Sequence, residues 1–455
     1  MNTMIDKKQF WKQLLPLMLP IAFQNMMQSL VSASDAVMMG FIDQASLSAV
    51  SLGTQVAFVV GLFNFGLTGA GNVLAAQYWG KESRESVEQV FAVMTRPMAL
   101  VGGVFTLAAM LFPQLLMRIF TTDPELIELG AVYLRVVSLS YFLTCINQSY
   151  LCIMRNSGRA IAASVIGSST VVINIVLNAV LIFGLLGLPA LGVAGAALAT
   201  TITRVVEFVW ILKENTKPDS IKLRRKYLFG KCPLNRDYWK QGWVLTANNL
   251  VWGIGITMGS VILGHLGTDA VAANSIAMVA KNLIICFCMG LASGGAILVG
   301  NELGAGRLES GKAYGEKVVS LSLTCGVISA GILIALTPLI LNLAELSEQA
   351  TEYLRWMILV CAGNLIGMSH NSATISGIFS SGGDTKFGFI CDCITLWAIV
   401  VPLGLLAAFV FHWPVMLIYV FINMDEWVKF PAVRVHFRKY NWVRDLTRQD
   451  QEETV

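Results

Sequence analysis

Residues 40–86 read GFIDQASLSAVSLGTQVAFVVGLFNFGLTGAGNVLAAQYWGKESRES, and residues 264–310 read GHLGTDAVAANSIAMVAKNLIICFCMGLASGGAILVGNELGAGRLES. The two stretches align without a gap at a constant offset of 224 residues. The residues of the first stretch that recur at the matching positions are Gly40, Ala49, Ser51, Phe63, Gly66, Leu67, Gly71, Leu74, Gly80, Glu85 and Ser86. A chain that repeats itself across its midpoint is expected to contain two copies of one structural unit.

The composition places both copies in a membrane. Only 13% of the residues are charged and 55% are hydrophobic, whereas a soluble domain needs more polar surface to cover itself. The nine cysteines lie mostly within apolar runs and lack the spacing of zinc ligands, so we interpret them as packing residues. We expect no metal centre other than a sodium ion, no organic cofactor and no nucleic-acid partner.

Twelve apolar runs are long enough to cross the hydrocarbon core of a bilayer. They are residues 14–41, 46–79, 88–117, 129–154, 160–187, 190–212, 238–265, 270–302, 313–342, 351–378, 387–411 and 413–434. Six lie in each half, which predicts an all-α integral membrane protein of 12 transmembrane helices in two parallel-repeat, six-helix lobes. The predicted parts are an N-lobe (1–212), a cytoplasmic linker (213–237), a C-lobe (238–437) and a cytoplasmic tail (438–455).

Basic residues set the predicted orientation. They follow the even-numbered spans, as at Lys81, Arg84, Arg155 and Arg159, and they crowd the linker 213–237. The alternate loops, such as FIDQASLS and AELSEQ, contain neither Lys nor Arg. This asymmetry predicts a multi-pass protein of the cell membrane with both termini in the cytoplasm. We interpret the linker as a solvated tether; contact between its basic residues and anionic lipid headgroups is the alternative.

Polar side chains inside the spans are the candidate functional groups, because an ionisable residue in lipid is costly. In the first half we identify one intramembrane acid, Asp35, whose helical face also carries Gln24 and Gln28 at i, i+4 and i+11 spacing. Asn174 and Asn178 share one face of the fifth span. A carboxylate and amides could bind sodium, or the carboxylate alone could carry a proton; a shallow, hydrated Asp35 is the structural alternative.

The second half lacks an acid equivalent to Asp35, because the offset aligns that residue with Gly259. The polar or aromatic residues that we place in its spans instead are Asn248, Asn249, Trp252, Lys281 and His370. Lys281 either snorkels or pairs with a neighbour, or it serves a substrate or counter-ion. His370 either bonds a neighbouring helix or accepts a proton. We interpret Asp392 as interfacial.

An ordered set of motifs resembles the multidrug and toxic compound extrusion (MATE) family over nearly the whole chain. The motifs are DAVMMG (35–40), AAQYWGKES (75–83), RNSGR (155–159), GVAGAALAT (192–200), VGNELGAG (299–306) and GGDTKF (382–387), with the asparagine pair of the fifth span. The resemblance implies two six-helix lobes around a V-shaped central cavity. It also implies sodium- or proton-coupled export of amphipathic, often cationic, organic compounds. By it, Asp35 matches the family's functional acid and Asn174 and Thr200 match its neighbours. Asn178 stands where some members have a second acid.

The sequence therefore predicts an alternating-access antiporter with ion coupling at Asp35, Asn174, Asn178 and Thr200. The predicted substrate cavity contains Gln24, Gln28, Asn248, Asn249, Trp252, Lys281 and His370. The alternative is a flippase or exporter of a lipid-linked or anionic metabolite. An enzyme is disfavoured, since the spans contain no paired aspartates and no His-Glu-x-x-His motif. We expect a monomer whose partners are a small organic substrate and membrane lipids.

Overall fold

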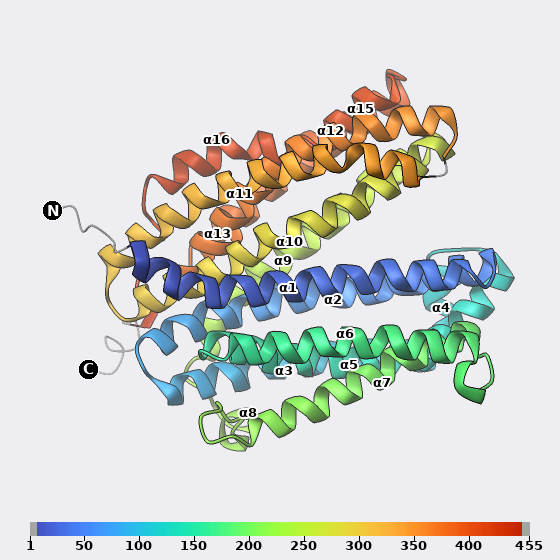
Figure 1. Cartoon of the computed structure of the whole chain (residues 1–455). Coiled ribbons are helices and arrows are strands. Elements are labelled where there is room, and N and C mark those ends of the chain that lie inside the picture. The colour runs from blue at the N-terminus through green and yellow to red at the C-terminus, as the bar shows by residue number, and fades with distance from the viewer. Residues whose placement is uncertain (1–6, 345, 448–455) are drawn as a thin grey trace. The chain divides into compact units, whose positions relative to one another are not determined.

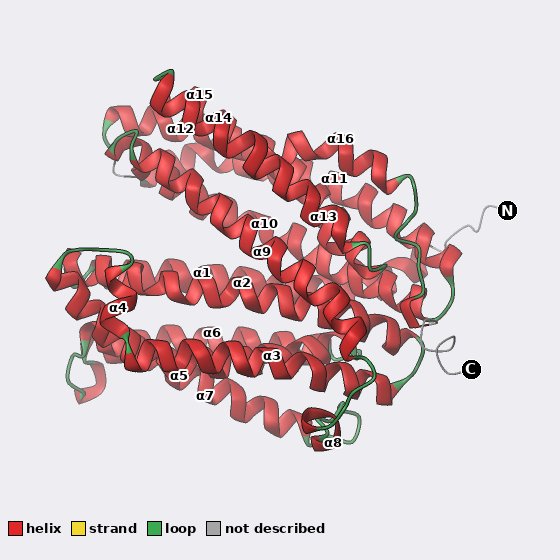
Figure 2. Ribbon diagram, turned by 180° about the vertical axis from the view of Figure 1, so that it is seen from behind, coloured by secondary structure: helices red, strands yellow, loops and turns green. Residues whose placement is uncertain are grey.

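A computed structural model describes residues 7–344 and 346–447; the side chains of Lys7, Ser32, Ala33, Asp35, Ala36, Val37, Met39 and Gly40 lie outside that description. The described residues are helical with short connections and contain no strand (Figure 2). The helices of the first half are α1 (Lys7–Gly40), α2 (Gln44–Gly80), α3 (Arg84–Leu111), α4 (Pro113–Arg118), α5 (Pro124–Asn156), α6 (Ala160–Phe183), η1 (Leu185–Gly187) and α7 (Gly192–Asn215), followed by α8 (Arg225–Phe229). Those of the second half are α9 (Asn235–Gly264), α10 (Thr268–Gly304), α11 (Leu308–Leu343), α12 (Glu348–Asn371), η2 (Ser372–Phe379), α13 (Thr385–Asp392), η3 (Cys393–Val400), α14 (Val401–Leu405), η4 (Leu406–Val410), α15 (Val415–Ile422) and α16 (Asp425–Phe437).

All twelve predicted spans fall on helix, which confirms the all-α membrane fold. Ten helices in the described part of the chain are long and apolar enough to cross a membrane. The tenth predicted span is α12 with η2, and its first turns carry charged residues that lower its hydropathy. The twelfth is broken, because α15 ends at Ile422 and α16 begins at Asp425.

Local sequence signals explain where several helices begin. Asp43 accepts hydrogen bonds from the backbone N–H of Ser46 (2.6 Å) and from its hydroxyl (2.8 Å), so it caps the start of α2. Asp123 accepts from the Glu125 N–H at 2.9 Å at the start of α5. Ser347 caps α12 through the Ala350 N–H at 3.1 Å. Each cap ends a short loop at the start of a long helix.

The chain divides into two compact units (Figure 1). The C unit comprises Met1–Met26, Ala76–Glu82 and Ala247–Val455, and the N unit comprises Met27–Ala75 and Ser83–Thr246. The unit boundaries cut through α1 and α9, so each unit contains the first part of the helix that opens the other half of the sequence. The two units do not have the bounds of the predicted lobes, 1–212 and 238–437. The lobes therefore stay a prediction that rests on the sequence repeat.

The first part of α1 packs in the C unit and the first part of α9 packs in the N unit. The two packing contacts are made at positions related by the repeat. In the C unit, a Cβ at Gly290 would lie 2.5 Å from the Ala22 side chain. In the N unit, a Cβ at Gly66 would lie 2.3 Å from the backbone of Thr246. Gly66 and Gly290 are 224 residues apart, and so are Ala22 and Thr246, which is the offset of the repeat. The repeat therefore specifies close helix packing through small residues.

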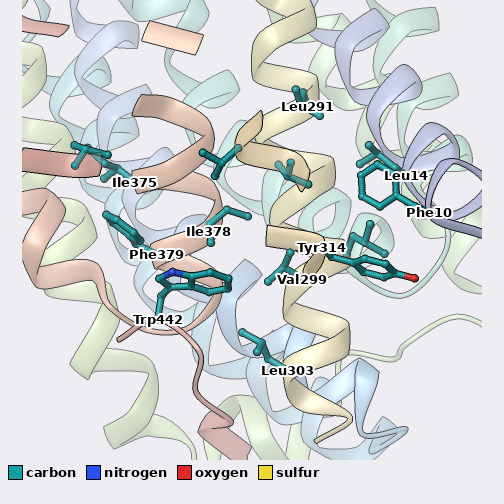
Figure 3. Close-up of a cluster of buried hydrophobic side chains, with 14 of the residues drawn as sticks. Phe10, Leu14, Leu291, Val299, Leu303, Tyr314, Ile375, Ile378, Phe379 and Trp442 are labelled. Atoms are coloured by element: carbon teal, nitrogen blue, oxygen red, sulfur yellow. The ribbon is translucent and has the colours of Figure 1, made fainter. Parts of the chain in front are cut away.

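A large apolar core lies within the C unit (Figure 3). It joins Phe10 and Leu14 of α1 to Leu291 and Val299 of α10, and Trp442 lies in the same cluster. Trp442 is fully buried, although it follows the last helix. The predicted tail 438–455 is thus packed into the unit over its described residues, 438–447; residues 448–455 lie outside the described residues.

The inter-repeat linker is bound to α3 within the N unit, so it is not a free tether, although many of its residues are exposed as the solvated interpretation predicts. Arg96 donates hydrogen bonds to the carbonyl oxygens of Tyr227, Leu228 and Gly230, the second at 2.9 Å. Arg224 pairs with Glu88 at 2.9 Å. These contacts anchor both sides of the short helix α8. A guanidinium that reaches three carbonyls was not evident from the linker sequence itself.

Candidate ion-binding site and buried charge networks

Two helices of the N unit share a chain of buried polar side chains. Asn174 and Asn178 lie one turn apart on α6, and both are buried. The Asn178 amide donates to Asn174 Oδ1 at 3.2 Å, and the Asn174 amide donates to the hydroxyl of Thr203 on α7 at 3.4 Å. The predicted pairing of the two asparagines is therefore present, and Thr203 is a member that the sequence analysis missed.

The other two predicted coupling residues are placed less directly. Thr200 is half-buried, and its hydroxyl donates to the Ala196 carbonyl of its own helix at 3.1 Å. Asp35 lies on the part of α1 that belongs to the N unit, but its side chain lies outside the described residues. The coupling site therefore stays a prediction. The structure describes its amide and hydroxyl groups, whereas the Asp35 carboxylate lies outside the described residues.

A second acid lies buried in the N unit, at Glu207 of α7, so Asp35 is not the only intramembrane acid of the first half. Glu207 is 1% exposed, and its Oε2 accepts from Arg204 at 2.8 Å and from the amide of Asn147 on α5 at 2.9 Å. The Asn147 amide also donates to the Arg204 carbonyl at 3.1 Å. This triad joins α5 to α7. An Arg–Glu pair at i, i+3 in an apolar run was the signal available in the sequence.

The residues predicted to line a substrate cavity are divided between the units. Gln24, Asn248, Asn249 and Trp252 belong to the C unit and are half-buried, whereas Gln28 belongs to the N unit and is exposed. A substrate cavity lined by all of these residues therefore stays a prediction.

Lys281 is buried within the C unit and pairs with a neighbouring helix. It is 7% exposed, and its Nζ donates to Asn364 Oδ1 of α12 at 2.7 Å. The Asn364 amide in turn donates to the Asn423 carbonyl at 2.8 Å and lies 3.4 Å from Asp425 Oδ1. Of the two interpretations of Lys281, the structure therefore favours pairing.

A lysine of α16 gathers three carboxylates close to this contact. Lys429 Nζ lies 3.0 Å from Asp392 of α13, 3.1 Å from Glu426 and 3.6 Å from Asp425. Asn371 of α12 donates to the Glu426 carboxylate at 2.8 Å. All four charged residues are at most 7% exposed, so Asp392 is buried among the helices of the C unit. Its interfacial position in the membrane stays a prediction. The sequence analysis missed this network; the signal available was the spacing of Asp425, Glu426 and Lys429 at i, i+1 and i+4 within the predicted span 413–434.

His370 lies beside the network and takes no part in it. It is 1% exposed, and its ring centroid is 4.7 Å from that of Phe430. Neither ring nitrogen has a hydrogen-bond partner among the described residues. The expected bond to a neighbouring helix is therefore not seen, and the ring is held by apolar contact.

Twelve helical spans in two compact units, each with ionisable side chains buried inside it, define an integral membrane protein of the transporter class. The MatE family model matches residues 20–180 and 244–406, which is most of the chain in two blocks that follow the repeat. The chain belongs to the MatE family, as its motifs predicted, and members of this family are membrane transporters.

Relatives match along nearly the full length. The chain is 26% identical over 411 residues to a probable multidrug resistance protein NorM of Rhizobium meliloti, covering 87% of this chain and 85% of that protein. It is 23% identical to the uncharacterized transporter YisQ of Bacillus subtilis, covering 93% of each. A MOP superfamily transporter from Pyrococcus furiosus shares its fold with a TM-score of 0.86 at 18% identity, covering 95% of this chain and 96% of that one.

Proposed function

We propose that this transporter is a cation-coupled antiporter that exports amphipathic organic compounds by alternating access. The names of the relatives support multidrug efflux, since several are probable multidrug resistance proteins. We place the protein in the cell membrane with cytoplasmic termini, because basic residues follow its even-numbered spans. We also propose that it is a monomer. Small organic molecules and membrane lipids are its proposed partners.

The observation that carries the coupling proposal is the buried amide–hydroxyl chain of α6 and α7. Asn178, Asn174 and Thr203 present oxygen atoms inside the unit that also contains the Asp35 segment of α1. Oxygen donors of this kind suit a hard cation, and a carboxylate beside them would supply the charge. Entry of one elementary charge along the membrane potential supplies about 2.3 kcal/mol per 100 mV. That energy would drive the export of one substrate against a gradient.

The alternative substrate class is a lipid-linked or anionic metabolite. A single buried lysine, Lys281, which donates to Asn364, does not make a strongly cationic cavity. An organic, amphipathic substrate is therefore the proposal that we favour, and the lipid-linked or anionic metabolite stays the alternative.

The test is gradient-driven efflux from proteoliposomes by Asp35→Asn. We expect the loss of at least nine-tenths of the driven efflux with the melting temperature unchanged. The matched control is Asp219→Asn, which neutralises an exposed acid of the linker. Undiminished efflux by Asp35→Asn would contradict coupling at this residue.

A further inference from the structure

We propose that the C unit contains a proton-binding site in the network of Lys281, Asp392, Asp425, Glu426 and Lys429, and that it holds one proton on Asp425. This site lies outside the predicted coupling site on α1, α6 and α7. It does not depend on ion coupling at Asp35.

The charges of the network do not balance. Three carboxylates and two ammonium groups leave one surplus negative charge if every group is ionised. All five residues are at most 7% exposed. Lys281 and Asp392 lie in helices long and apolar enough to cross a membrane, and the other three lie in the predicted span 413–434. An unbalanced charge in such a place is strongly disfavoured, so the network must take up one positive charge.

The other charged neighbours do not supply the missing positive charge. The elements packed against α16 are α12, η2, α13 and η3. Beyond the network they bring His370, Cys391 and Cys393 close to it, and none of these side chains carries a positive charge as a neutral ring or thiol. The η2 segment SATISGIF has no ionisable side chain. His370 contacts Phe430 and no carboxylate, so a charged ring there would itself be unpaired. Arg434, further along α16, is exposed and its charge acts on His370. Among the described residues, the ion pairs of the three carboxylates are with Lys429 and not with Arg434.

The three carboxylates of the network suit a proton better than a metal ion. The position that a cation would take among the three carboxylates is occupied by Lys429 Nζ, within 3.0 to 3.6 Å of all of them. No group of three His, Cys, Asp or Glu side chains in the described parts of the chain is arranged to hold a metal ion. A proton, in contrast, needs only one carboxylate oxygen.

The contacts single out Asp425 as the carrier. Asp392 and Glu426 lie close to Lys429, at 3.0 and 3.1 Å, and Glu426 also accepts from Asn371 at 2.8 Å. Asp425 has the longest lysine contact, 3.6 Å, and its amide contact with Asn364 is 3.4 Å. Its carboxylate is the least stabilised of the three.

The test is infrared spectroscopy of the purified, full-length protein, because a protonated carboxyl group has a carbonyl stretch that a carboxylate lacks. We expect one such buried band in the native protein at neutral pH, and its loss in Asp425→Asn, where two acids balance two lysines. Asp35→Asn and Asp219→Asn should each keep the band. A native protein without the band, or a band that survives in Asp425→Asn, would overturn the proposal.

A second variant tests the charge balance itself. Lys281→Met removes one ammonium group, so the surplus grows from one to two and the band should roughly double. An unchanged band in this folded variant would contradict the balance argument. Neither measurement uses transport, so failure here is distinguishable from failure of ion coupling at Asp35.

Discussion

Gly304 of α10 lies against the backbone of Gln77 of α2, so closely that a Cβ at Gly304 would be 1.9 Å from the Gln77 carbonyl oxygen. The repeat supplies the reciprocal contact, in which a Cβ at Gly80 would be 2.0 Å from the Asn301 carbonyl oxygen. Each residue of one contact is 224 positions from its counterpart in the other. The two copies of the repeat therefore meet within the C unit through the same pair of positions.

Substitution of Gly304 by alanine should destabilise the protein by about 1–3 kcal/mol or more, because the added methyl meets backbone that no side-chain rotation can clear. The thermal unfolding of the detergent-solubilised protein would measure this. Gly331→Ala is the control, since a Cβ there meets nothing within 4 Å and alanine favours helix. Equal melting temperatures for the two variants would show that the contact is not tight.

Replacement of Asn174 by alanine should remove any stabilisation by the coupling ion. If sodium binds there, sodium at ten times its dissociation constant stabilises the native protein by about 1.4 kcal/mol, and the variant should lose that increment. Thermal unfolding in sodium and in potassium chloride at equal ionic strength measures the difference. Thr201→Val, which removes a hydroxyl bonded to Val136 instead, is the control. A sodium effect that persists in Asn174→Ala would place the ion elsewhere.

The Glu207–Arg204 pair should show a favourable coupling energy of about 1–3 kcal/mol in a double-mutant cycle, since the acid is buried and Arg204 is its charged partner. Glu207→Gln alone leaves the arginine without that partner, so it should cost more stability than the double variant with Arg204→Gln. Additive effects of the two substitutions would contradict the pairing.

Release of the linker is expected from Arg96→Ala, because this residue holds three of its backbone carbonyls. Trypsin should then cut the basic segment around α8 several-fold faster than in the native protein. Arg118→Ala, which removes an exposed arginine of α4, is the control. A cleavage rate unchanged in Arg96→Ala would mean that the linker is held by other contacts.

The helices, their number and the repeat could be predicted because hydrophobic length and periodicity are local properties of the sequence. The glycines of the repeat also indicated close packing, although the exchange of the first segments of α1 and α9 depends on tertiary contacts. The network around Lys429 was missed because its members come from α10, α12, α13 and α16, and no local pattern shows which distant charges meet. The anchoring of the linker was missed for the same reason: Arg96 lies far from it in sequence.

The central claim is that an ion gradient drives export, and the most direct test is accumulation of a fluorescent amphipathic cation by proteoliposomes containing the purified protein. Sodium and pH gradients would be imposed separately, with the membrane potential clamped. We predict that one of the two gradients moves the dye beyond its equilibrium distribution and that collapse of that gradient abolishes the effect. Dye that only equilibrates under both gradients would contradict coupled transport.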